Sequence, residues 1–313
     1  MLSIKRASGF SGLFRHGGDC HMPEPLRRST WRDWLYLLGQ FGLVAGVELS
    51  DDFVHALHPL ENAPSGAAHA GEVMHFEMAH GFWFEPGIQS FFTHTHTILG
   101  HEIGWNQIRP IADTLYGQGH VLFTLCFAIW VFFYRRGLFT FVRNVFLITN
   151  MLAVTLYEAF PLAPPRLASG LSYDHHPFHF LDPIFSKGGA GVSLSFNEYA
   201  AMPSVHVAWA TIVGVTLAWA TRSWIMRVLG LLYPAVMVTT VIVTGNHYLS
   251  DALGAEAVVL VALLCAILMA WRASGHHSLH RVLSHLQRLR HGSPQSVASA
   301  SDGRPAAAPT VAA

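Results

Sequence analysis

The chain has 313 residues, of which 51% are hydrophobic and 12% are charged, and its formal net charge at pH 7 is zero. This composition, together with a positive mean hydropathy, argues against a pair of soluble domains and favours one membrane domain. Three cysteines are too few for a disulfide framework, so we expect buried or reduced thiols.

The amino-terminal tail, residues 1–33, is basic and contains no apolar run long enough for a signal peptide. We therefore expect it to lie in the cytoplasm. A first membrane-spanning helix is predicted from Trp34 to about Leu49, a run that is short for a bilayer. This span should place Asp51 on the outer side.

Residues 50–113 contain no sustained apolar run. The stretch GFWFEP has three consecutive aromatic residues, and with the nearby acidic residues Glu77 and Glu85 it predicts an amphipathic segment at the level of the lipid headgroups. The histidines between positions 55 and 101 leave a transition-metal site open, since imidazole binds zinc, copper and nickel. No ligand spacing with a supporting carboxylate stands out among them.

Five further apolar runs predict membrane spans. They extend from about Thr114 to Tyr134, Asn144 to Phe160, Ser204 to Ala220, Val228 to Thr244 and Leu249 to Trp271. With six spans, the arginine-rich connections fall on one face of the membrane, which predicts that this face is cytoplasmic. The loop of residues 161–202 then lies outside. The expected fold is all-α, a polytopic membrane protein built as a bundle of six transmembrane helices.

The domain organisation follows from these spans. Residues 1–33 form the basic cytoplasmic tail and residues 34–273 the membrane domain that carries the chemistry. Residues 274–313 begin with leucines at helical spacing, which predicts a cytoplasmic amphipathic segment on the inner membrane surface. The remainder is rich in Gly, Ser, Pro and Ala and is expected to be disordered.

Two histidines mark the ends of the fourth and fifth spans. His206 and His247 are 41 positions apart. Because about 20 helical residues cross a hydrocarbon core of about 30 Å, one helix down and one back returns His247 to the level of His206. Pro203 suits the first position of a helix, which would leave the N–H of Ser204 and of the two residues after it facing a phosphate. A lone histidine in an apolar segment is more often a core residue, but ionisable groups paired at helix ends favour function.

Further polar residues accompany the pair. Asp251 follows His247 by four positions, so its carboxylate can reach one imidazole nitrogen and select the tautomer. Arg166 follows two prolines, and its planar guanidinium can bind two phosphate oxygens, although interfacial arginines also serve as membrane anchors. Asn197, Tyr199 and Ser204 could instead cap the fourth span, and for Asn197 and Tyr199 we weigh this capping role against support of the site. Asn246, beside the second histidine, is a possible supporting residue.

The motifs NEYAAMPSVH and GNHYLSD, preceded by FPLAPPRL, resemble the type 2 phosphatidic acid phosphatase (PAP2) superfamily over roughly residues 110–270, and within it the inositolphosphotransferase branch. The commoner phosphatase pattern has a lysine seven residues before the first arginine and a Ser-Arg pair upstream of the second histidine. This chain has Ala159 and Thr240-Val241 at those positions, and Leu167 and Val205 where that pattern has proline and glycine. Two phosphate-binding cations are therefore missing.

The resemblance implies a role for each residue. His247 would attack phosphorus, Asp251 would orient it, His206 would protonate the leaving oxygen, and Arg166 with Ser204 would bind the phosphate. The implied function is transfer or hydrolysis of a phospho-headgroup at the extracytoplasmic face through a phosphohistidine.

The expected partners are the membrane and a phospholipid or lipid-phosphate substrate, with no nucleic acid, no metal and no other cofactor. The alternatives are an ordinary phosphatidic acid or prenyl-phosphate phosphatase and, in another class, a histidine-rich metal-binding or transport protein. The expected location is the cell membrane, with both termini in the cytoplasm.

Overall fold

A computed structural model of the protein describes residues 30–57, 62–168, 172–173, 176–177 and 197–273. The predicted basic tail, except for its last four residues, and the predicted carboxy-terminal amphipathic segment lie outside the described residues. The prediction of a mostly helical fold is confirmed.

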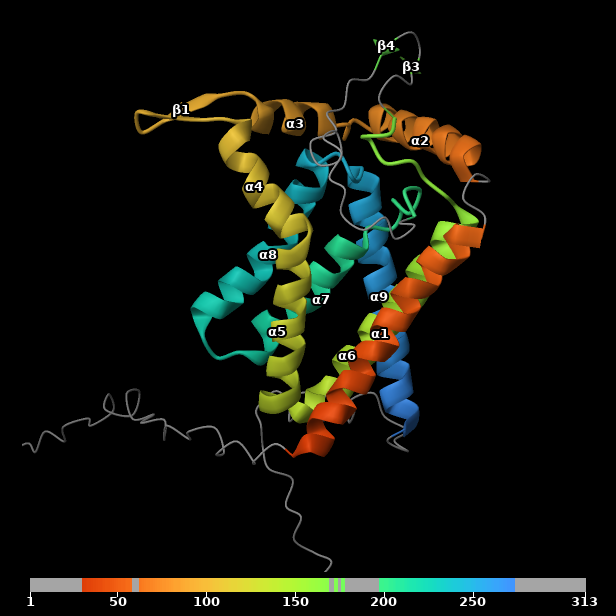
Figure 1. Ribbon diagram of the computed structural model, residues 1–313, viewed down its shortest axis with the longest axis vertical. Coiled ribbons are helices and arrows are strands. Elements are labelled where there is room, and N and C mark those ends of the chain that lie inside the picture. Colours follow the sequence, from red (N-terminus) through yellow and green to blue (C-terminus); the bar gives the residue numbers. More distant parts are fainter. Residues whose placement is uncertain (1–29, 58–61, 169–171, 174–175, 178–196, 274–313) are drawn as a thin grey trace, which may run out of the picture.

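Within the described residues, seven helices form the body of the molecule (Figure 1). They are α1 (Trp31–Leu57), α4 (Trp105–Tyr116), α5 (Gln118–Tyr134), α6 (Arg136–Ala159), α7 (Val205–Ala220), α8 (Trp224–Val243) and α9 (Leu249–Ala273). In this bundle α7 packs mainly on α8, while α6 packs on both α9 and α1. A Cβ on Gly214 of α7 would collide with the carbonyl oxygen of Gly230 on α8. Both positions therefore need glycine, because the two backbones cross in contact.

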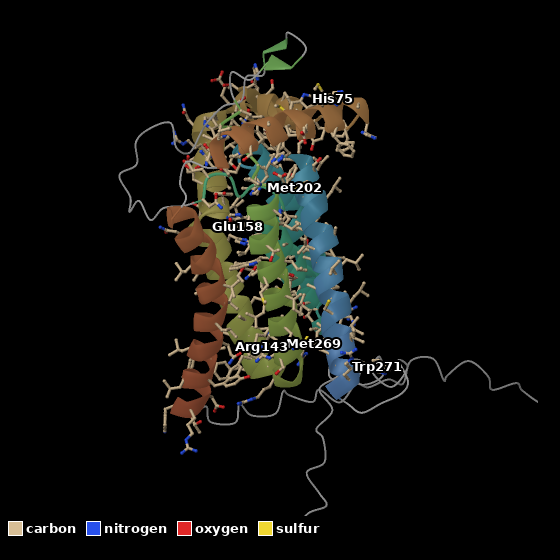
Figure 2. The ribbon with its side chains drawn as sticks, turned by 90° about the vertical axis from the view of Figure 1, so that its right-hand side faces the viewer. His75, Arg143, Glu158, Met202, Met269 and Trp271 are labelled. Atoms are coloured by element: carbon tan, nitrogen blue, oxygen red, sulfur yellow. The ribbon has the colours of Figure 1, made fainter. Side chains whose placement is uncertain are left out.

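Two further helices, α2 (Asn62–Ala79) and α3 (Glu85–Thr93), lie across the end of the bundle that is uppermost in Figure 1. Two antiparallel hairpins extend from the same end. They consist of β1 (His96–Ile98) with β2 (His101–Ile103) and β3 (Ser172–Tyr173) with β4 (His176–Pro177). Figure 2 shows His75 of α2 at this end, with Met202 just below it and Arg143 and Trp271 toward the opposite end. The segment that the sequence placed at headgroup level thus covers one end of the bundle.

Three of the described helices are long and apolar enough to cross a membrane, namely α6, α8 and residues 249–272 of α9. Helices α4 and α5 meet at an angle of 42° around Gly117 and together make a fourth candidate. The 16-residue α7 is apolar but shorter. The chain is therefore a multi-pass membrane protein. The structure supports three or four spans among the described residues, so the six spans stay a prediction.

Two predicted span boundaries are wrong. The first helix does not end near Leu49 but continues to Leu57, so Asp51 lies within it. The third does not begin at Asn144 but at Arg136. The sequence predicted Arg143 just before this helix, whereas the structure has it inside the helix. Its guanidinium donates to Gln40 Oε1 of α1 at 2.8 Å, and this hydrogen bond lets the helix accommodate a charged side chain.

Candidate active site

Three segments that are distant in sequence meet beneath α2. The loop after α6 pairs with the loop before α7 through a bridge between Leu162 and Ala200. The N–H of Arg166 in the first of these loops donates to the carbonyl oxygen of Gly245, in the turn between α8 and α9, at 2.8 Å. Gly245 has φ +67°, a left-handed conformation that glycine adopts without strain. These contacts bring Arg166 beside the second histidine.

The structure brings the two predicted histidines together. His206 lies in the first turn of α7, and His247 lies just before α9. Their ring centroids are 6.1 Å apart. The two imidazoles are therefore near neighbours, as a nucleophile and a proton donor for the same phosphorus atom must be.

The surroundings of His247 select one tautomer. Its Nδ1 is 2.8 Å from the carbonyl oxygen of Ala201 and 3.2 Å from Asp251 Oδ2. Both neighbours are acceptors, so Nδ1 carries the hydrogen and Nε2 keeps its lone pair. Asp251 is 0% exposed, and its Oδ2 also accepts from the Tyr248 N–H at 2.9 Å. The result is an oriented imidazole with a nucleophilic Nε2.

Arg166 is held against the same turn. Its side chain is buried, and Nε donates to Asn246 Oδ1 at 3.0 Å. The amide of Asn246 is oriented in turn, because its Nδ2 donates to Thr244 Oγ1 at 2.9 Å. Glu198 approaches the guanidinium at 4.0 Å from a half-exposed position. Asn246 therefore orients the arginine side chain, and its supporting role in the site stays a prediction.

The start of α7 differs from the expectation. Pro203 does not occupy the first helical position, because it precedes Ser204, which is the N-cap residue. Ser204 Oγ accepts from the Val207 N–H, and the Ser204 N–H donates to the Asp251 carbonyl oxygen at 3.1 Å. Ser204 is 0% exposed, so its described contacts link α7 to α9. The N–H groups that open the helix toward an anion are those of Val205 and His206.

Asn197 and Tyr199 shape the loop before α7. Asn197 is buried and its Oδ1 accepts from the Tyr199 N–H at 3.1 Å. The Tyr199 carbonyl oxygen accepts from the Leu162 N–H at 2.7 Å. Their described contacts thus join the two loops that carry Arg166 and Ser204, and neither residue caps α7.

Sequence reasoning missed a group of side chains behind His206. The ring of Tyr116 stacks on His206 with centroids 4.2 Å apart, and the centroid of His120 lies 5.2 Å away. His120 is buried, and its Nδ1 is 2.7 Å from the hydroxyl of Tyr233 on α8. The sequence signal that could have revealed this group is His120, a histidine inside an apolar run. A cavity of about 520 Å³ opens beside His206 and is lined by Tyr116, Gly117, Gln118, Val121, Leu122 and Leu125.

Two of the histidines considered as metal ligands contact backbone carbonyl oxygens instead. His94 Nδ1 is 2.6 Å from the Ser90 carbonyl oxygen, and His96 Nε2 is 2.6 Å from that of Phe91. Across the described part of the chain, no group of three or more His, Cys, Asp or Glu side chains is arranged to hold a metal ion.

Comparison with protein families gives a match to the PAP2 superfamily over residues 71–265. These residues include the second half of α2, both histidines and most of α9. Among curated proteins, none matches the chain. Among solved structures there is likewise no match.

Proposed function

This chain belongs to the PAP2 superfamily of membrane phosphatases and phosphotransferases, and from that premise we propose that it transfers phospho-headgroups between lipid-linked alcohols through a phosphohistidine at His247. The observation that carries the proposal is the environment of this residue. Its Nδ1 faces two acceptors, Ala201 and Asp251, while the ring centroid of a second histidine, His206, lies 6.1 Å away.

In the first step His247 Nε2 forms a bond to phosphorus, and the bond to the leaving alcohol oxygen breaks. His206 gives its proton to that oxygen, so the alcohol leaves neutral. Arg166 and the amides that open α7 stabilise the negative charge on the equatorial oxygens. Asp251 stabilises the positive charge of the phosphorylated imidazole through the hydrogen on Nδ1.

In the second step an acceptor attacks the phosphohistidine. His206, now neutral, takes the proton from the incoming hydroxyl, and His247 leaves with its lone pair restored. Water as acceptor gives a phosphatase, and a lipid alcohol gives a transferase. The mostly apolar cavity beside His206 supports an acceptor or donor with a hydrocarbon chain.

Within the superfamily we favour the inositolphosphotransferase-like branch, because two cations of the phosphatase pattern are absent. Val241, at one of these positions, is 0% exposed and packs in an apolar cluster with Val207 and Met237. Ala159, at the other, is the last residue of α6. A phosphomonoester dianion carries more charge than a diester, so a site with fewer cations discriminates less in its favour.

The donor test compares two lipids. Purified protein in lipid nanodiscs is offered phosphatidylinositol with a lipid alcohol, or phosphatidic acid alone, in the presence of a strong chelator. We expect headgroup transfer to exceed release of inorganic phosphate, as measured by mass spectrometry of the products. Free phosphate as the dominant product would identify an ordinary lipid phosphatase. Loss of all activity with the chelator would favour the metal-dependent alternative.

We also propose six spans, with α1 and α7 as the additional two and with the site on the extracytoplasmic side. Arginines lie at the helix ends that are remote from α2 (Figure 1). They are Arg135 after α5, Arg222 after α7, Arg227 in the first turn of α8 and Arg272 in the last turn of α9. Arg135, for example, donates to the Ala220 carbonyl oxygen at the end of α7. Such clustering marks the cytoplasmic face.

Topology can be tested with single cysteines in a background that has Ser at positions 20, 126 and 265. Gly170 and Lys187 would suit the outer loop by sequence but lie outside the described residues. We therefore choose Glu102, which is exposed on β2, in the hairpin that extends from the same end of the bundle as α2 and α3. Glu102→Cys is expected to react with an impermeant thiol reagent in intact cells, and Ser223→Cys between α7 and α8 only after permeabilisation. The reverse labelling pattern would place the site in the cytoplasm.

A further inference from the structure

Two acidic side chains from α2 and α3 are buried against the start of α9. Glu77 is 0% exposed and Glu85 is 1% exposed. Each carboxyl accepts a hydrogen bond from a backbone amide at the start of α9. Glu77 Oε1 accepts from the Ser250 N–H at 2.7 Å, and Glu85 Oε1 accepts from the Leu249 N–H at 2.6 Å. The first amides of a helix lack intrahelical partners and favour negative charge.

The second oxygens of the two carboxyls are also buried. Neither Glu77 Oε2 nor Glu85 Oε2 has a hydrogen-bond partner among the other described groups. The two side chains instead interact with each other. Two ionised carboxylates in such contact would repel, whereas one proton between them gives each oxygen a partner. Burial, and then the neighbouring Glu85, raise the pKa of Glu77 from its ordinary value near 4.5 to about 8.

The amides that the pair binds belong to the short stretch between the proposed nucleophile and its orienting acid. Leu249 and Ser250 lie between His247 and Asp251 in the chain. A shift of these two residues would therefore alter the 3.2 Å contact between His247 Nδ1 and Asp251 Oδ2. The two glutamates therefore contact the segment that sets the distance between His247 and Asp251.

We propose that Glu77 and Glu85 share one proton and act as positioning residues, which together hold the first turn of α9 so that Asp251 can orient His247. This role rests on the proposed phosphohistidine chemistry. It adds two residues that the PSVH and GNHYLSD motifs do not contain.

The groups around the pair offer little charge to offset a second ionised carboxylate. Tyr248, in the loop before α9, is buried and stacks on Trp83 with ring centroids 6.4 Å apart. Burial, followed by the nearby acids, raises the pKa of Tyr248 well above its ordinary value, so it stays a neutral phenol. Asp251, a further acid, interacts electrostatically with both Glu85 and Tyr248. Loss of the shared proton would therefore push the two carboxylates apart.

Glutamine substitutions distinguish a shared proton from two independent caps. In Glu77→Gln or Glu85→Gln, the amide oxygen can accept from the α9 backbone while the amide N–H donates to the remaining carboxylate, as the shared proton does. In the double variant both oxygens are required by the backbone, so the two NH₂ groups face each other.

The experiment measures turnover of the donor lipid in nanodiscs from pH 6 to pH 10. Wild type should lose activity as the pH rises through about 8. Each single variant should retain most of its turnover at neutral pH and lack that alkaline loss, whereas the double variant should fall by roughly a hundredfold because buried donors are left unpaired. Glu72→Gln, an exposed position on α2, serves as the matched control with the wild-type profile.

Opposite results would overturn the proposal. Single variants as impaired as the double variant would exclude a shared proton, and a fully active double variant would exclude a positioning role. Activity that requires a divalent cation and disappears in both single variants would mean that the pair binds a metal instead.

Failure of the phosphohistidine chemistry on which this role rests would be recognised separately, because the wild type would then turn over neither donor lipid. The pair would still be tested by thermal unfolding, since a carboxyl whose pKa is raised on folding stabilises the folded state at low pH. That contribution is lost progressively as pH rises from the ordinary value near 4.5 to the folded value of about 8. The unfolding midpoint should fall over this range more in wild type than in either single variant, and equal slopes would count against the pair.

Discussion

His247→Ala should abolish both turnover and formation of the phosphorylated enzyme, with a loss of at least about 10⁴-fold in kcat. The reason is that Nε2 of this residue forms the bond to phosphorus. Asp251 and Ala201 orient the imidazole through Nδ1, and alanine offers them no nucleophile to orient. The measurement is incorporation of radioactive phosphate from a labelled lipid into protein, as an acid-labile and base-stable adduct.

His206→Ala provides the comparison that separates the two histidines. With a donor whose leaving group needs no proton, such as a nitrophenyl phosphate ester, this variant should still become phosphorylated. Its natural reaction should slow by about 10²–10⁴-fold, the usual contribution of a general acid. Loss of labelling in both variants with the activated donor would contradict the assigned roles, as would normal labelling of His247→Ala.

Asp251→Asn should lower kcat by roughly 10³-fold while KM changes little, because the side chain touches the nucleophile and not the substrate. An amide oxygen can still accept from Tyr248 N–H and His247 Nδ1, which preserves the fold of the turn. The negative charge that stabilises the phosphorylated imidazole is lost, however. Phosphoenzyme formation in a single turnover measures this step directly.

Glu256→Gln is the matched control for that substitution. Glu256 lies one turn further along α9, is exposed, and accepts from Thr211 Oγ1 at 2.6 Å, a hydrogen bond that glutamine retains. Its kcat should stay within about threefold of wild type. If Asp251→Asn behaved like this control, the orienting role of Asp251 would have to be abandoned.

Several features of this protein follow from the sequence alone because they depend on spacing along helices. The apolar runs predicted α5, α8 and α9 to within a few residues at most ends, and the distance between His206 and His247 predicted that helices of membrane length bring them to one level. The four-residue interval to Asp251 likewise predicted its contact with the imidazole. Such relations are local or repeat with the helix, so no tertiary contact is needed to infer them.

The tertiary structure decided whatever depends on which loops and helix ends meet. Glu77 and Glu85 are 173 and 164 positions from the amides they bind, a relation without any periodic signal in the chain. Ser204 has its N–H engaged by Asp251, a contact that a helix start read in isolation does not reveal. A carboxyl beside aromatic residues suits the membrane interface by composition, whereas its burial depends on an unpaired helix terminus from elsewhere in the fold. For this reason the sequence indicated the reacting groups, and the fold alone determined how they are held.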